Sequence, residues 1–295
     1  MINEFSMWTI TVVAVNLGIA IAAISGFRFF LGVLTGVNTT IELSEKDNYA
    51  FGITFAGGAL ALALVLSAAV TGDAASNLAV EAMNVATYAV AGIALLKIGS
   101  LVNDFVIFHK VSLKEAVSQH NIGAGVVQAA NLLALGIVIS SVVNWVDSEN
   151  WEGVMPVCMV FVAAQLVLLI VTRLRAQIFS RRHQGESFQI AIKEGNTALA
   201  IRYAGHILGT SLAVGAGGSL VTYFHEQPLL SAATWGAVAV VLALILSALS
   251  LLARKLILAK INVVEEVDSQ QNVGIAYVEA VIFIAVGLLL KAVLV

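Results

Sequence analysis

Long apolar stretches with few charges dominate this chain of 295 residues. A helix needs about 20 mostly apolar residues to cross the hydrocarbon core of a bilayer. Stretches of that kind lie near residues 6–36, 49–71, 77–103, 121–145, 153–180, 197–223, 231–258 and 272–294. Only 11% of the residues are charged, against about 25% in soluble domains. The sequence therefore predicts an all-α integral membrane protein with eight transmembrane helices.

The connections between these stretches alternate in charge. Those after the second, fourth and sixth stretches are short and acidic, whereas those after the first, third, fifth and seventh are longer and basic. The basic side collects 12 of the 15 Lys and Arg residues, namely Arg28, Lys46, Lys110, Lys114, Arg173, Arg175, Arg181, Arg182, Lys193, Arg254, Lys255 and Lys260. Because basic loops remain in the cytoplasm, we expect the N-terminus and the C-terminus on the non-cytoplasmic side.

Four segments of the chain resemble one another. They begin at residues 46, 119, 194 and 270 and read KDNYAFGITFAGG, QHNIGAGVVQAAN, EGNTALAIRYAGH and QQNVGIAYVEAVI. The third residue of each is an asparagine, at intervals of 73, 75 and 76 residues: Asn48, Asn121, Asn196 and Asn272. Each interval contains two apolar stretches, so every copy enters the membrane in the same direction. This pattern predicts four parallel two-helix repeats, related by an axis along the membrane normal.

A finer alternation groups the four copies in pairs. Seven residues after the asparagine stand Phe55, Gln128, Tyr203 and Glu279, which are aromatic, polar, aromatic and polar. Copies one and three therefore match, as do copies two and four. We interpret the chain as two tandem four-helix halves, residues 1–146 and 150–295, each with two hairpins.

Small residues recur at fixed places after each asparagine. The positions 4, 8 and 15 residues on are Gly, Ala or Ser in all four copies, and so are the positions 2 and 13 residues on. At about 100° per residue, the second set lies nearly opposite the first on a helix. In lipid, small residues let helix backbones approach closely. We therefore expect the even-numbered helices to pack on both sides and to be the inner or most crowded ones.

The four asparagines themselves have two interpretations. Asparagine is a favoured N-cap, and each of the four stands where a helix enters the membrane from the basic side. The alternative is a ring of four amides at a cytoplasmic mouth that coordinates an ion or a lipid headgroup.

The paired hairpins, each entered through an asparagine followed by small residues, resemble domain-of-unknown-function family 350, the YjfL-like bacterial inner-membrane proteins. The resemblance covers most of the chain, in two copies. It implies a multi-pass protein of the bacterial inner membrane. The genes of this family stand beside those of membrane-stress proteins, which implies a cytoplasmic stress-related partner. The family supplies no established reaction, so it assigns no catalytic residue.

Few ionisable or strongly polar side chains lie deep in the predicted spans. An ionisable group at that depth costs several kcal/mol unless it is paired or hydrated, so it indicates function by default. The candidates are Lys97, Gln128, Arg202, His206 and Glu279. One interpretation is a polar path for an ion or small solute among the even-numbered helices. The other is a structural salt bridge between Arg202 and Glu279.

The longest basic connection reads RLRAQIFSRRHQGES and carries Arg173, Arg175, Arg181 and Arg182. Positive-inside topology explains most of this charge. Binding of acidic membrane lipids, or docking of an acidic cytoplasmic partner, is a further role for such a surface. The neighbouring segments SLKEAVSQH and FQIAIKEG are short amphipathic pieces that could lie along it.

Several kinds of site have no support in the sequence. The net charge of -3 argues against a nucleic-acid partner, and Cys158, the one cysteine, excludes an internal disulfide. The five histidines lack metal-ligand spacing, no nucleophile stands beside a base, and nothing indicates a cofactor or an enzyme. The small-residue pattern GHILG permits a homo-oligomer but is weak evidence for one. Two functions remain: a channel or transporter, and alternatively a non-catalytic scaffold that recruits cytoplasmic or envelope-stress partners through its basic loops.

Overall fold

The computed structural model describes residues 7–35, 37–71, 77–146 and 153–294, in which helices are present and strands are not. The long helices are α1 (Met7–Thr35), α2 (Tyr49–Ala69), α3 (Leu78–Val102), α5 (Ile122–Val146), α6 (Val154–Arg182), α8 (Thr197–Gly215), α9 (Pro228–Ile257) and α10 (Val273–Leu294). The predicted all-α fold is confirmed. Within the described ranges, seven helices are long and apolar enough to cross a membrane, and α8 is not among them.

Helix α8 differs from the others in length and composition. It has 19 residues and carries Arg202 and His206. The stretch predicted to continue to residue 223 leaves the α-helix after Gly215, and Ala216–Ser219 form a 3-10 turn, η4. At Gly217 and Gly218 a Cβ atom would meet the rings of Trp235 and Trp145 at 3.4 and 3.3 Å. The glycines therefore serve close packing at the end of α8.

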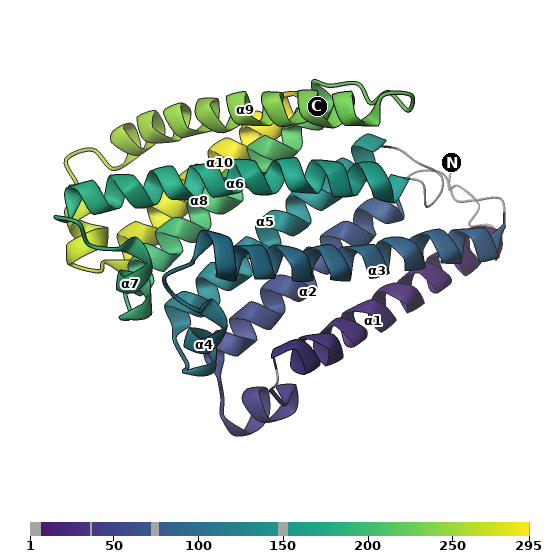
Figure 1. The fold of residues 1–295 in the computed structure, drawn as a ribbon, viewed down its shortest axis with the longest axis horizontal. Helices are drawn as coiled ribbons and strands as arrows, with labels where there is room; N and C mark the ends of the chain where they lie inside the picture. The colour runs from purple at the N-terminus through teal and green to yellow at the C-terminus, as the bar shows by residue number, and fades with distance from the viewer. Residues whose placement is uncertain (1–6, 36, 72–76, 147–152, 295) are drawn as a thin grey trace.

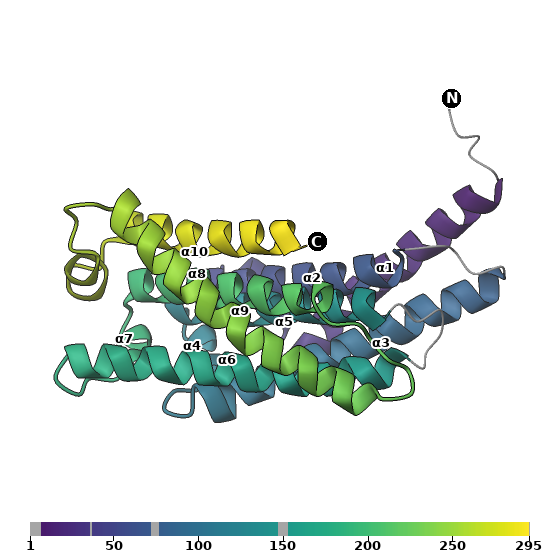
Figure 2. The same cartoon turned by 90° about the horizontal axis from the view of Figure 1, so that it is seen from above.

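The long helices form two layers (Figures 1 and 2). One layer is a row in which α2 packs on α5, α5 on α8, and α8 on α10. The other layer contains α1, α3, α6 and α9, with α6 packed on α9 and α3 on α1. Each helix of the row begins directly after one of the four repeated asparagines.

Backbone-to-backbone contacts hold the row together. A Cβ atom on Gly125 of α5 would lie 2.6 Å from the carbonyl oxygen of Ala50 on α2, and one on Gly136 would lie 2.6 Å from Cα of Ala61. At both contacts the residue 2 or 13 places after one asparagine meets the residue 4 or 15 places after the next. Both contacts join residues that are 75 positions apart in the sequence, so α2 and α5 run in the same direction. The two small-residue sides predicted from the sequence thus face neighbouring helices.

Burial varies along the row. In the most apolar part of α5, 78% of residues are buried, against 33% in α10. The prediction that the even-numbered helices are the inner ones is right for α5 and α8 but not for α2 and α10. The reason is that the row is open, with α2 and α10 at its two ends (Figure 1).

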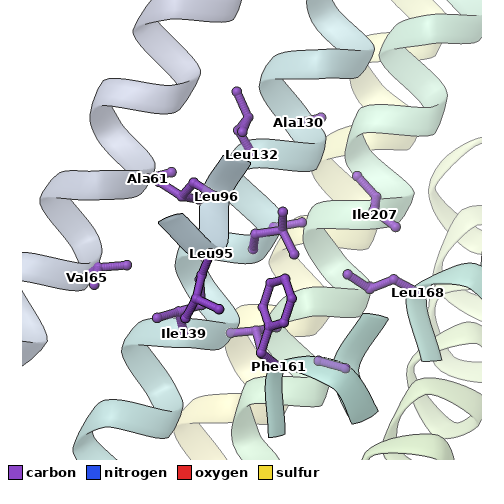
Figure 3. Packing of buried hydrophobic residues seen from close by; sticks show 14 of the residues in the cluster. Ala61, Val65, Leu95, Leu96, Ala130, Leu132, Ile139, Phe161, Leu168 and Ile207 are labelled. Atoms are coloured by element: carbon purple, nitrogen blue, oxygen red, sulfur yellow. The ribbon is translucent and has the colours of Figure 1, made fainter. Parts of the chain in front are cut away.

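The core of the bundle lies where the two layers meet. Figure 3 shows buried side chains from α2, α3, α5, α6 and α8 in one cluster, among them Ala61, Leu96, Ile139, Phe161 and Ile207. Without a hydrophobic driving force between helices in lipid, such contacts stabilise the bundle through close packing.

Short elements gather at the end of the bundle where the asparagines lie. They include α4 (Leu113–Ser118), α7 (Phe188–Lys193) and three π-helical turns, η1 (Ile41–Glu45), η2 (Asn103–Ile107) and η5 (Glu265–Ser269). Helices α4 and α7 lie side by side with the ends of α5 and α8 (Figure 1). They coincide with the two amphipathic pieces found in the sequence. Leu113 and Ile192 are the side chains that anchor them, each 1% exposed.

Candidate functional site

All four repeated asparagines are helix N-caps. The side-chain oxygen of each accepts from the backbone N–H three residues on: Asn48 from Phe51, Asn121 from Ala124, Asn196 from Leu199, and Asn272 from Ile275, at 2.8–3.2 Å. A side-chain oxygen at this position satisfies one of the unpaired donors in the first helical turn.

Three of the asparagines also connect consecutive repeats. Their side-chain amides donate to the carbonyl oxygen four residues before the next repeated asparagine: Asn48 to Val117, Asn121 to Ile192, and Asn196 to Asp268, at 3.0–3.2 Å. These bonds place the four caps in a line at one end of the bundle. The amides therefore form a row of structural contacts, and the alternative of a closed ring at a mouth does not match this geometry.

A network of buried charges centres on Arg202 of α8 and Glu279 of α10. Arg202 Nε donates to Glu279 Oε2 at 2.6 Å, and Arg254 of α9 donates to Glu279 Oε1 at 2.7 Å. Arg202 also pairs with Asp268 of η5 and donates to the carbonyl oxygen of Val263 at 3.1 Å. Glu279 is 0% exposed, so its charge depends on these two arginines.

Two histidines stand beside this network. His206 Nε2 lies 3.7 Å from Glu279 Oε1, and the imidazole packs on the ring of Phe283 with centroids 3.8 Å apart. His183 Nε2 lies 3.6 Å from Asp268 Oδ2. Each would add a positive charge to the network if it were protonated.

The network forms part of the wall of a cavity of about 340 Å³ between α6, α8 and α9. Arg202, His206, Arg254 and Asp268 are among its lining residues. Arg175 and Arg182 of α6 also line it, and the Arg175 guanidinium lies 5.0 Å from the centre of the Phe283 ring. We call this space the second-half pocket.

Lys97 and Gln128 lie elsewhere. They line a different cavity, of about 410 Å³, together with residues of α1, α3 and the segment before α4. Gln128 donates to Ser100 Oγ at 3.0 Å. The structure therefore separates the set of polar residues found in the sequence. It unites Arg202, His206 and Glu279, and leaves Lys97 and Gln128 in the first half.

Equivalent positions in the two halves carry different chemistry. Six residues after the first asparagine of each half stand Thr54 and Arg202, and seven after the second stand Gln128 and Glu279. Thr54 Oγ1 donates to the carbonyl oxygen of Ala50 at 3.0 Å. A hydroxyl and an amide thus occupy, in the first half, the positions that hold an ion pair in the second.

The four arginines of the basic connection lie in different surroundings. Helix α6 continues to Arg182, so the four arginines belong to a helix rather than a loop. Arg173 donates to the carbonyl oxygen of Val106, Arg175 faces the pocket, and Arg181 and Arg182 are exposed.

Sequence reasoning missed two members of the network. Arg254 counted among the loop cations, yet it lies three residues before the end of α9, and Glu279 lies six residues after the start of α10. In an antiparallel hairpin these two positions lie at similar depth. That geometry predicts the pairing of Arg254 with Glu279 from the sequence. The sequence signal for Asp268 is its place four residues before Asn272, the position whose carbonyl oxygen accepts from the asparagine of the preceding repeat.

The described residues contain no group of three His, Cys, Asp or Glu side chains placed to hold a metal ion. No curated protein and no solved structure matches this chain. A family model described as Domain of Unknown Function (DUF350) matches it twice, over residues 5–143 and 149–294. Together these matches span nearly the whole sequence. The chain belongs to the DUF350 family and consists of two tandem copies of its domain.

Proposed function

We propose that the protein crosses the bacterial inner membrane eight times, as four parallel two-helix repeats with both termini on the non-cytoplasmic side. In this topology α8 is the sixth of the eight spans, and Arg202 enters the membrane because Glu279 and Asp268 neutralise its charge. The hydrogen bonds that join the four asparagine caps support it, since they require the caps to share one side.

We further propose that the protein transports an anionic solute, which enters through the second-half pocket. The supporting observation is an open cavity whose wall carries Arg202, Arg254 and Asp268 and which adjoins the buried Glu279. Four guanidinium groups and two carboxylates meet there, so the pocket has an excess of positive charge. Ionisable groups inside a membrane span are typical of substrate and ion paths.

The location of the pocket refines the expected path. The cavity lies between the two layers, against α6 and α9, rather than within the row of asparagine-capped helices. Within the row, backbones touch through glycine and alanine, which leaves no room for a solute there. The path in this proposal therefore runs along the face of α8 that is turned toward α6 and α9.

Transport can be tested with the purified chain in liposomes. Uptake of chloride, phosphate and acetate would be followed under imposed gradients, and movement of a fluorescent acidic lipid between leaflets would be followed in parallel. We expect at least one probe to move, and Glu279→Gln and Arg202→Ala to lower its rate at least tenfold. Arg181→Ala removes a nearby charge outside the pocket and should leave the rate unchanged. If no probe moves under any gradient, transport is contradicted.

A scaffold is the second candidate. Its supporting observation is a set of exposed cations at the end of the bundle where the asparagine caps lie, namely Lys110, Lys114, Arg181, Arg182 and Lys193. Crosslinking in cells tests this function. Capture of one defined cytoplasmic protein, lost when these cations are replaced by glutamine, would support it, and capture of none would contradict it.

A further inference from the structure

The second-half pocket opens sideways, toward the lipid. Its rim on α6 includes Ile170, Leu174 and Ile178, which are 53%, 51% and 47% exposed. Its rim on α9 includes Leu244 and Leu251, which are 63% and 43% exposed. These side chains face out of the bundle on the two outer-layer helices. A ligand can therefore reach the cavity from within the membrane, between α6 and α9.

The walls of the pocket change in character along α6. The lining residues run from Val167 to Arg182, a distance of roughly 22 Å along the helix. Apolar side chains line most of this length, and Arg182 lies at the end near the basic side. This gradient matches a molecule with a hydrocarbon body and a polar head at the membrane surface.

Two of the cations that line the pocket have no carboxylate within ion-pair distance among the described residues. Arg202 and Arg254 are held by Glu279 and Asp268. Arg175 packs on the ring of Phe283, and neither Arg175 nor Arg182 forms an ion pair within 4 Å in the described residues. The two are seven residues apart on α6, so they lie on the same side of the helix, two turns apart. Guanidinium groups bind phosphate through paired hydrogen bonds.

We propose that the second-half pocket binds an acidic membrane lipid, with its phosphate at Arg175 and Arg182 and its acyl chains against Leu174, Leu244 and Leu251. The lipid enters sideways between α6 and α9. The inference names the substrate class for the proposed transport, and it rests on that proposal only in regarding this pocket as the entry.

The positive excess of the site favours an acidic headgroup over a zwitterionic one. Asp268, the carboxylate lining the pocket, faces Arg202 and His183, and Glu279 faces Arg202, Arg254 and His206. Glu279 attracts Arg175, and Asp268 attracts Arg182, only from beyond ion-pair distance. A phosphate there would pair with Arg175 inside the pocket, where an unpaired cation is costly, and with Arg182 at its exposed end.

Binding can be measured on the full chain in detergent by titration with phosphatidylglycerol, with native mass spectrometry as the readout. We expect a single saturable lipid, and phosphatidylcholine should bind at least tenfold more weakly. Arg175→Ala combined with Arg182→Ala should weaken binding of phosphatidylglycerol at least tenfold, because two charge-assisted contacts are lost. Arg181→Ala is the matched control: it removes the same charge one residue away, outside the lining, and should leave binding unchanged.

The apolar wall has its own test. Leu174→Gln with Leu251→Gln changes exposed rim positions and should weaken lipid binding while the protein elutes as a folded species in gel filtration. Inorganic phosphate at millimolar concentration should not displace the lipid. If phosphate displaces it, the site takes the free anion and the lipid proposal is overturned. Equal loss in the Arg181 variant would also overturn it, because the effect would be one of general surface charge.

The binding and transport experiments can contradict the two proposals separately. Specific lipid binding without movement of any probe contradicts the proposed transport and supports this inference. Movement of a small anion without specific lipid binding contradicts this inference and supports transport.

Discussion

Arg202 and Glu279 are 77 residues apart in the chain and meet through a 2.6 Å hydrogen bond from Nε to Oε2. The bond joins the third repeat to the fourth at the wall of the second-half pocket. It exists because α8 and α10 run parallel and touch backbone to backbone. At Gly205 of α8 a Cβ atom would lie 2.2 Å from Cα of Ala280, the neighbour of Glu279.

Neutralising Glu279 should destabilise the protein strongly. Glu279→Gln leaves Arg202 and Arg254 buried against an amide, and removing one partner of a buried pair costs about 3–5 kcal/mol. Unfolding of the purified variant in detergent by heat or denaturant measures the loss. The matched change in the first half is Gln128→Glu, which adds a carboxylate without an arginine partner and should also destabilise.

The double variant Thr54→Arg with Gln128→Glu transplants the ion pair into the first half. Because the two positions correspond to those of Arg202 and Glu279, the second change should restore part of the stability that Gln128→Glu removes. A double-mutant cycle gives the coupling. Coupling near zero would mean that the halves are not equivalent at these positions.

Close contact between α8 and α10 depends on glycine. We expect Gly205→Ala to lower the free energy of unfolding by about 1–3 kcal/mol, the usual cost of overpacking, because the new methyl group meets the backbone of Ala280. Gly18→Ala in α1 is the control, since a Cβ atom there has no neighbour within 4 Å. It should be neutral or stabilising by up to about 1 kcal/mol. Equal effects of both changes would contradict the tight interface.

The asparagine caps should differ in importance. Asn121 caps α5 and also donates to two carbonyl oxygens of the next repeat, those of Ile192 and Lys193. Asn272 caps α10 and donates to its own Glu266. Loss of a cap costs about 1 kcal/mol, and loss of a further hydrogen bond costs about 1 kcal/mol more. Denaturant titration should therefore find Asn121→Ala less stable than Asn272→Ala.

Stability should fall in acid partly through Glu42. Hydrogen bonds from Lys46, at 2.7 Å, and then Asn48, at 2.8 Å, lower the pKa of this buried carboxyl below its ordinary value of 4.5. A lowered pKa in the folded state stabilises the protein above the ordinary value, and this contribution is lost as the pH falls through the folded value. Glu42→Gln should be less stable than the parent chain at pH 7, with the difference shrinking as the pH falls below 4.5, the ordinary pKa of this carboxyl. A difference that stays constant with pH would contradict this role.

Much of the architecture can be predicted from the sequence because it depends on two features that the sequence shows directly. These are the spacing of the repeated asparagines and the length of the apolar stretches. The interval between asparagines predicts the helices of the row, α2, α5, α8 and α10, and the small residues predict the two packed sides of α5 and α8. The pairing of Arg202 with Glu279 was one of two interpretations. The sequence does not determine which helices are lateral neighbours, so it could not separate Gln128 from Arg202 or place Arg175 in a pocket. It also could not distinguish an open row from a ring, because both need the same two sides on each inner helix.

Cysteine accessibility in intact cells tests the shared direction of the four repeats. With Cys158 replaced by serine, single cysteines would be placed at the exposed positions Lys46, Gln119, Glu194 and Gln271, each beside one asparagine cap, and at Glu226 between α8 and α9. An impermeant thiol reagent added from outside should leave the first four unlabelled and label the cysteine at position 226. Labelling of some cap positions from outside and protection of others would divide the caps between the two faces of the membrane and contradict the parallel repeats.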